Sequence, residues 1–116
     1  MANTFKIKSN ANMPASAGTP LTLYTVPGAT TSVVLGLLLT NTHTADVTVS
    51  VQLVSDTSDT ETNETIYLLR NTEIPVGSTL EIMSGNKVVL QTTDVMKIDC
   101  SVAAKIDAAL SIMEIT

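Results

Sequence analysis

The chain has 116 residues and a formal net charge of −5, with 44% hydrophobic and only 15% charged residues. This length suits one domain with a single core. The acidic balance and six scattered basic residues argue against binding to a nucleic-acid backbone. No apolar run approaches the roughly 20 residues of a membrane span, and the N-terminal segment lacks the apolar stretch of a signal peptide, so we expect synthesis in the cytosol and no membrane partner. The basic residues are Lys6, Lys8, Arg70, Lys87, Lys97 and Lys105.

The first 20 residues contain the short alternating run FKIK and then SNANMPASAGTP, which is rich in small residues and has two prolines. Such a stretch is typical of a loop or an arm. The stretch could cross an edge of the domain or reach a neighbouring subunit, and we favour the second, with residues 1–20 as an N-terminal arm. Residues 21–116 would then form the folded domain.

Residues 21–53 hold the strongest strand signals. The run LTLYTV is followed by SVVLGLLL and then by VTVSVQLV, in which apolar and polar residues alternate with the two-residue period of a half-buried strand. Gly36, inside the second run, indicates a β-bulge or a close approach of another backbone. The segment NTHTAD predicts a hairpin turn between the second and third runs, with His43 as a solvated residue at its tip.

The only long polar run is SDTSDTETNE at residues 55–64, which predicts an exposed loop. Its carboxylates (Asp56, Asp59, Glu61 and Glu64) could collect a calcium ion. The run lacks the alternating acids, central glycine and final glutamate of an EF-hand loop, so we predict no metal site there.

The remaining chain offers further short strands in TIYLLRN, TLEIMS, KVVLQ, VMKIDCSV and IDAALSIMEI. Turn signals predict one hairpin around residues 84–86 and another between the last two strands. About eight or nine strands with no helical periodicity indicate an all-β, single-domain antiparallel β-sandwich of jelly-roll or immunoglobulin-like type. The shared phase of alternating residues predicts a core of Val33, Leu35, Leu37, Val49, Val51, Ile98, Leu110 and Ile112.

The sequence presents no group equipped for catalysis. His43 is the single histidine, and no nucleophile motif surrounds it. Cys100 is in phase with apolar neighbours, which favours a small buried hydrophobe over a reactive thiol. Tyr24 and Tyr67 are interpreted as core or interface residues, with ligand contact as the alternative. We therefore predict no catalytic, cofactor-binding or metal-binding residues, no cofactor and no enzymatic activity.

Three segments carry a resemblance to a known group of proteins: LYTVPGATTSVVLGLLLTNTHTADVTVSVQLV, EIPVGSTLEIMSGNKVVLQTTDVMKI and the ending AALSIMEIT. Together they resemble small β-sandwich virion structural proteins of tailed bacteriophages, including phages of cyanobacteria. The likeness covers residues 21–116 and rests on packing motifs. It departs from the group at the acidic loop 55–64.

The resemblance implies a structural role on the virion. The leading hypothesis is a capsid decoration or cement protein that binds the major capsid protein and stabilises the outer capsid surface. The alternative is a component of the tail, baseplate or fibres, with a receptor- or glycan-binding role. Because the strand faces carry few charges and the sheet edges have few guards, we also expect a homo-oligomer, with a trimer favoured. An unrecognised enzyme or inhibitor is a third hypothesis.

Overall fold

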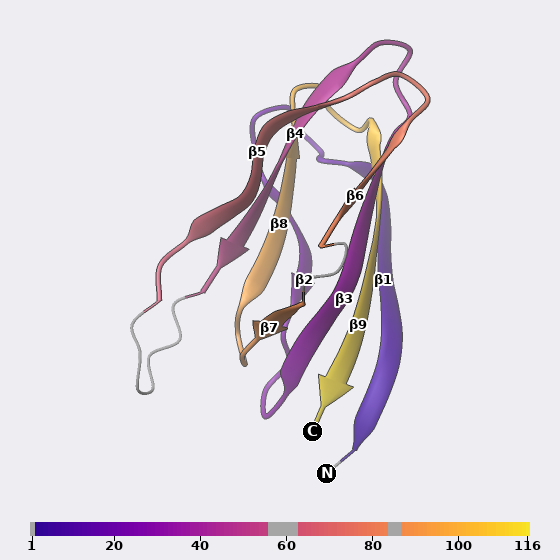
Figure 1. Ribbon diagram of the computed structural model, residues 1–116. Coiled ribbons are helices and arrows are strands. Elements are labelled where there is room, and N and C mark those ends of the chain that lie inside the picture. Colours follow the sequence, from indigo (N-terminus) through magenta and orange to yellow (C-terminus); the bar gives the residue numbers. More distant parts are fainter. Residues whose placement is uncertain (1, 56–62, 84–86) are drawn as a thin grey trace.

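Two antiparallel β-sheets face each other across one core (Figure 1). The computed structural model describes residues 2–55, 63–83 and 87–116, and these ranges contain nine strands and no helix. The predicted all-β sandwich is therefore confirmed. The strands are β1 (Asn3–Met13), β2 (Leu21–Thr25), β3 (Thr31–Asn41), β4 (Val47–Val54), β5 (Ile66–Ile74), β6 (Thr79–Ile82), β7 (Val88–Leu90), β8 (Val95–Cys100) and β9 (Ile106–Ile115).

The larger sheet has the order β1-β9-β3-β6, with β7 also paired to β3. The smaller sheet has the order β2-β8-β4-β5. Most strands that are consecutive in sequence lie in opposite sheets, so the loops cross repeatedly from one layer to the other. This crossing closes both ends of the core, and both chain termini lie at the same end of the molecule (Figure 1).

The predicted hairpins are wrong. β3 and β4 lie in different sheets, as do β8 and β9, so the NTHTAD turn and the loop before β9 connect the layers. β6 and β7 both pair with β3, at Leu37–Thr40 and Ser32–Val34 respectively, and not with each other. A turn motif shows where a chain reverses, but burial decides which strand it then pairs with.

The core confirms most of the predicted apolar set and corrects two members of it. Val33 is only half-buried and Leu35 is 37% exposed. The reason is the bulge predicted at Gly36, where the pairing of β3 with β9 shifts register between Val34 and Gly36. One extra residue reverses the inward phase. The predicted residues that are buried are Leu37, Val49, Val51, Ile98, Leu110 and Ile112.

The N-terminal arm expected over residues 1–20 is corrected by the strand pairing. β1 pairs antiparallel with β9 of the same chain, from Asn3 opposite Ile115 to Met13 opposite Ile106. Met13 is fully buried in the core. Residues 14–20 form the loop that carries the chain to β2 in the other sheet. The alternation of Phe5 and Ile7 with lysines therefore belongs to an edge strand of the sandwich.

Candidate functional site: a cleft between the two sheets

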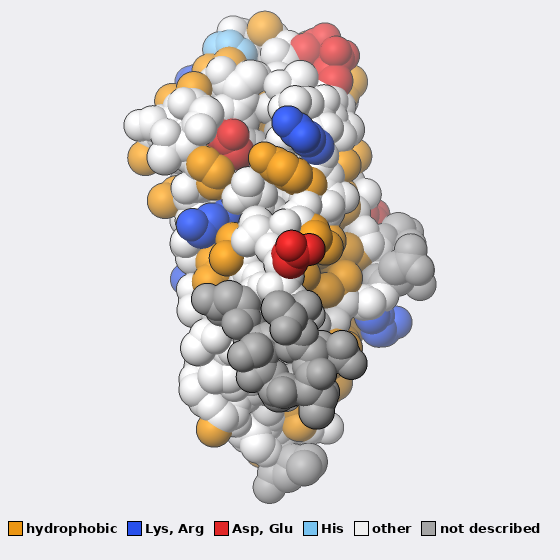
Figure 2. Space-filling model, turned by 90° about the vertical axis from the view of Figure 1, so that its left-hand side faces the viewer, with side chains coloured by type: hydrophobic (Ala, Val, Ile, Leu, Met, Phe, Trp, Pro, Cys, Tyr) orange, Lys and Arg blue, Asp and Glu red, His pale blue; other side chains and the backbone are white. Residues whose placement is uncertain are grey.

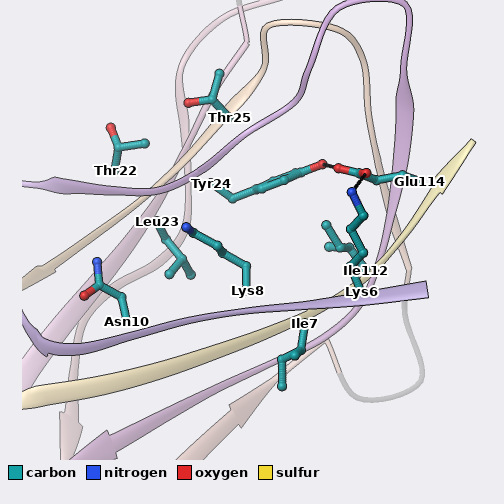
Figure 3. Close-up of a pocket in the computed structure, with 10 residues that line it drawn as sticks. All are labelled: Lys6, Ile7, Lys8, Asn10, Thr22, Leu23, Tyr24, Thr25, Ile112 and Glu114. Atoms are coloured by element: carbon teal, nitrogen blue, oxygen red, sulfur yellow. Dashed lines mark hydrogen bonds and ion pairs between the residues drawn. The ribbon is translucent and has the colours of Figure 1, made fainter. Parts of the chain in front are cut away.

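A cleft of about 480 Å³ opens where β1 of the larger sheet faces β2 of the smaller one (Figure 3). Both are edge strands, so the sandwich is open along this side. The cleft has a polar and partly charged lining above an apolar floor. Its lining residues are Lys6, Ile7, Lys8, Asn10, Thr22, Leu23, Tyr24, Thr25, Ile112 and Glu114.

A buried polar network closes one end of the cleft. The Tyr24 hydroxyl donates to Glu114 Oε2 at 2.5 Å, and its oxygen lies 2.6 Å from Ser32 Oγ. Because the single phenolic proton is directed at the carboxylate, Ser32 is the donor in the second bond. Lys6 Nζ lies 2.7 Å from Glu114 Oε1. Figure 3 shows the side chains of Tyr24, Glu114 and Lys6 meeting tip to tip.

The network perturbs the titration of its two acidic groups in opposite directions. Burial, reinforced by the hydrogen bond to Glu114, raises the pKa of Tyr24 to about 12. Hydrogen bonds from Lys6 and then from Tyr24 hold the pKa of Glu114 below its ordinary value, against the opposing effect of burial. At neutral pH, Tyr24 is thus a neutral donor and Glu114 a fully ionised acceptor. Neither group is poised to exchange a proton, which makes the network a structural tie between the sheets.

The rest of the cleft is lined by one lysine and several neutral polar side chains. Lys8 extends from β1 toward β2 (Figure 3), and no carboxylate in the described part of the chain forms an ion pair with it. Asn10, Thr22 and Thr25 add amide and hydroxyl groups around it. A cation surrounded by neutral polar groups fits a carboxylate or another anionic side chain of a partner.

The residues singled out by the sequence do not converge on this cleft, apart from Tyr24. His43 lies in the turn after β3, where its backbone N–H donates to Asn41 Oδ1. Cys100 is buried in the core, as predicted. Tyr67 is 47% exposed and lies under the Arg70 guanidinium, with 5.0 Å to the ring centroid, so it is not a core residue and the interface role stays a prediction.

Metal binding finds no support in the described ranges 2–55, 63–83 and 87–116, which contain no group of three or more His, Cys, Asp or Glu side chains placed to hold an ion. Most of the acidic run 55–64 falls outside these ranges, including Asp56, Asp59 and Glu61. The described residues likewise include no helix long and apolar enough to cross a membrane.

Sequence reasoning missed the cleft because it placed Lys6 and Lys8 on a separate arm. The signal was present in the alternation Phe5-Lys6-Ile7-Lys8, which puts both lysines on one face of a strand. The sequence did not predict that Glu114 is buried in the cleft. Its phase with Leu110 and Ile112 places an acidic residue on a strand face that is expected to be apolar. The position of Glu114 is explained only by the fold, which brings β1, β2, β3 and β9 together around it.

Comparison with known proteins adds no relative. No protein-family model matches the chain, and no curated protein matches its sequence at a significant level.

Proposed function

We propose that this chain is a non-enzymatic structural protein of a bacteriophage virion that decorates the capsid, binding the outer surface of the major capsid protein and stabilising it. The chain is synthesised in the cytoplasm of the bacterial host and resides in the virion. The resemblance of residues 21–116 to small virion β-sandwiches suggests this role. The structural observation that supports it is the edge strand β1 with the adjacent cleft.

β1 is 11 residues long, and no described strand pairs with it on the side away from β9. An unpaired edge of this length presents backbone N–H and C=O groups that can accept a strand from another protein. Natural monomeric sandwiches usually protect such edges with charged side chains, prolines, bulges or very short strands. β1 carries Lys6 and Lys8 and a register shift after Asn10, but its pairing with β9 is regular from Asn3 to Asn10. Here the edge is long and runs beside the open cleft, which suits a protein that functions in an assembly.

Lys8 gives this edge a chemical preference. A partner segment that pairs with β1 would place every second side chain over the cleft. The ammonium group of Lys8, which has no ion-pair partner among the described residues, favours an acidic side chain at one of these positions. We therefore infer that the capsid protein contributes an extended segment with acidic residues alternating along one face.

The copy number of the chain in purified virions tests the proposal. Quantitative mass spectrometry against the major capsid protein should find hundreds of copies per particle. A handful of copies per particle would indicate a tail, baseplate or fibre role instead of capsid decoration. Absence of the chain from virions would overturn both.

A binding experiment tests the proposed contact. Purified protein should rebind capsids from a phage that lacks this gene, and Lys8→Glu should weaken the binding at least tenfold, within the range measured for truncated interfacial charge pairs. The matched control is Arg70→Glu, which reverses a charge that is also exposed, on the edge strand β5 of the other sheet. Equal binding by Lys8→Glu and the unmodified chain would overturn the role of the cleft.

A further inference from the structure

The outer face of the larger sheet, turned away from the core, carries a continuous apolar row. The row runs across four strands from Phe5 to Met113, Val33 and Val89, which are direct partners in the strand registers. Phe5 is 72% exposed and Val89 is 61% exposed. Bulky apolar side chains aligned in this way, with no described residue covering them, are typical of a protein interface.

A second row on the same face has small residues on β1 and β9 and a leucine on β3. Ser9 lies opposite Ala109, and Ala109 lies opposite Leu38. These three residues line a hollow of about 310 Å³. The hollow is open to solvent and also has polar lining residues, among them Thr40 and Asp107. Its volume exceeds that of an enclosed apolar cavity of about 150 Å³ that binds benzene, so an aromatic ring fits into it.

The bulky row and the hollow are four residues apart along β1 and β9, which corresponds to about 14 Å. Midway between them lies the row in which Ile7 faces Ser111. Consider a two-fold axis that lies between two facing copies, perpendicular to the strands and next to this middle row. It places the bulky row of each copy over the hollow of the other. Phe5 of each chain then enters the Ser9–Ala109 hollow of its partner, and both contacts form at once.

We propose that the outer face of the larger sheet binds the same face of a second copy, giving a two-fold symmetric dimer with reciprocal Phe5 contacts. This is an isologous interface, which closes on itself at two subunits. It therefore specifies a dimer, whereas the trimer favoured by the sequence would need a head-to-tail contact. The inference stands apart from the capsid role, because the dimer requires no other protein.

The size of the face suits a stable dimer. Four adjacent strand positions and strands of up to 11 residues give a face of about 19 Å by 37 Å, or roughly 700 Å². Standard specific interfaces bury about 800 Å² per partner. The two sheets would stack at about 10 Å with a small angle between their strands, as the layers of a sandwich do.

Among the described residues, the face carries two carboxylates: Asp107 on β9, which also lines the hollow, and Glu81 on β6, which lies opposite Leu38. The axis places Glu81 beside the partner's Val89 at the lateral edge of the face, where its carboxylate stays in contact with water. Asp107 lies four residues before Ser111 on β9, and Ile115 lies four residues after it. The axis therefore places the Asp107 carboxylate near the partner's row of Asn3, Ile115 and Thr31, and not against the second Asp107. The β5 side of the molecule carries basic and acidic side chains interspersed with apolar ones (Figure 2).

The mass in solution tests the proposal. Analytical ultracentrifugation of the 12.2 kDa chain should report twice that mass. Phe5→Glu should raise the dimer dissociation constant about 30-fold or more, the effect of losing an interface hot spot. Ala109→Trp, which fills the hollow, should act in the same direction. The control Val76→Glu changes a residue that is 52% exposed outside this face, and it should leave the dimer intact.

Crosslinking gives a readout that does not depend on destabilising the dimer. Ser111→Cys places a thiol beside the two-fold axis, where a short bis-maleimide should join two chains. Ser101→Cys, an exposed position after β8, should not crosslink, and the buried Cys100 is common to both variants. A clean monomer at the highest attainable concentration, a trimer, or a dimer that survives Phe5→Glu and Ala109→Trp would each overturn the proposal.

Discussion

The hydroxyl of Tyr24 on β2 donates a 2.5 Å hydrogen bond to Glu114 on β9, joining the two sheets through their buried side chains. Ser32 and Lys6 satisfy the remaining groups, so the network includes residues from four strands. A buried carboxylate is costly unless every partner is present. The network is therefore expected to fix how the sheets align at their open side, and removal of single members should be measurable.

Tyr24→Phe removes only the hydroxyl and should lower the free energy of unfolding by about 1.5 to 3 kcal/mol, the range for a hydrogen bond to a charged group. Urea denaturation followed by circular dichroism measures the change. Tyr67→Phe is the control, because Tyr67 is half exposed, and it should change stability by less than about 0.5 kcal/mol. Equal changes in the free energy of unfolding for the two substitutions would show that the network does not stabilise the fold.

Glu114 should make the protein sensitive to acid. Its pKa is lowered in the folded state by Lys6 and Tyr24, from an ordinary value of 4.5. The unfolded chain therefore takes up the proton at a higher pH than the folded one, so this stabilisation is present above pH 4.5 and is lost as pH falls through the folded pKa. Urea midpoints measured from about pH 6 down to pH 3 should fall more steeply for the unmodified chain than for Glu114→Gln. Parallel curves would contradict the prediction.

Tyr24 should resist ionisation in alkali. Its pKa of about 12 lies above the ordinary value of 10.0, so its contribution to stability is complete below pH 10 and is lost as pH rises through 12. In a Tyr67→Phe background, the phenolate absorbance reports Tyr24 alone, because the chain has two tyrosines. A midpoint near 10 in a chain that circular dichroism shows to be folded would contradict the burial of this hydroxyl.

Leu37→Ala and Leu35→Ala should differ sharply although the two residues are neighbours in an apolar run. Leu37 is fully buried and its truncation should cost about 2 to 5 kcal/mol. Leu35 is 37% exposed and its truncation should cost less than about 1 kcal/mol in the isolated monomer. Chemical denaturation of both variants at low protein concentration measures the difference, and similar losses would place both side chains in the core.

This pair shows what the sequence could and could not predict. Alternation of apolar residues predicts strands and their inward faces correctly for β4, β8 and β9, where the period is unbroken. In β3 the bulge was foreseen at Gly36, but the phase reversal that it causes was not, because a run of apolar residues has no polar positions to reveal the change. Strand order was beyond local signals, since pairing depends on residues distant in the sequence.

The cleft could not be predicted from local sequence patterns for a related reason. Tyr24, Glu114 and Lys6 are separated by up to 108 positions, and each alone has an ordinary explanation. Small residues and prolines after Ser9 favoured an arm, yet residues 10–13 complete β1 and residues 14–20 form the loop that follows it. The deciding contact is the burial of Met13, an unbranched side chain that fills core space and has no periodic neighbours to indicate it.

Deletion of residues 2–13 should destabilise the isolated domain. The deletion removes Met13 from the core, leaves Glu114 without its Lys6 partner and strips the pairing from β9. Loss of the Met13 side chain alone is worth about 2 to 5 kcal/mol. The thermal midpoint should therefore fall by about 10 °C or more. Met13→Ala should reproduce much of the loss, whereas Phe5→Ser, at an exposed position of the same strand, should leave the midpoint of the monomer nearly unchanged. A truncated domain that melts like the full chain would show that β1 is an appendage, and the pairing of β1 with β9 would then contribute nothing to the fold.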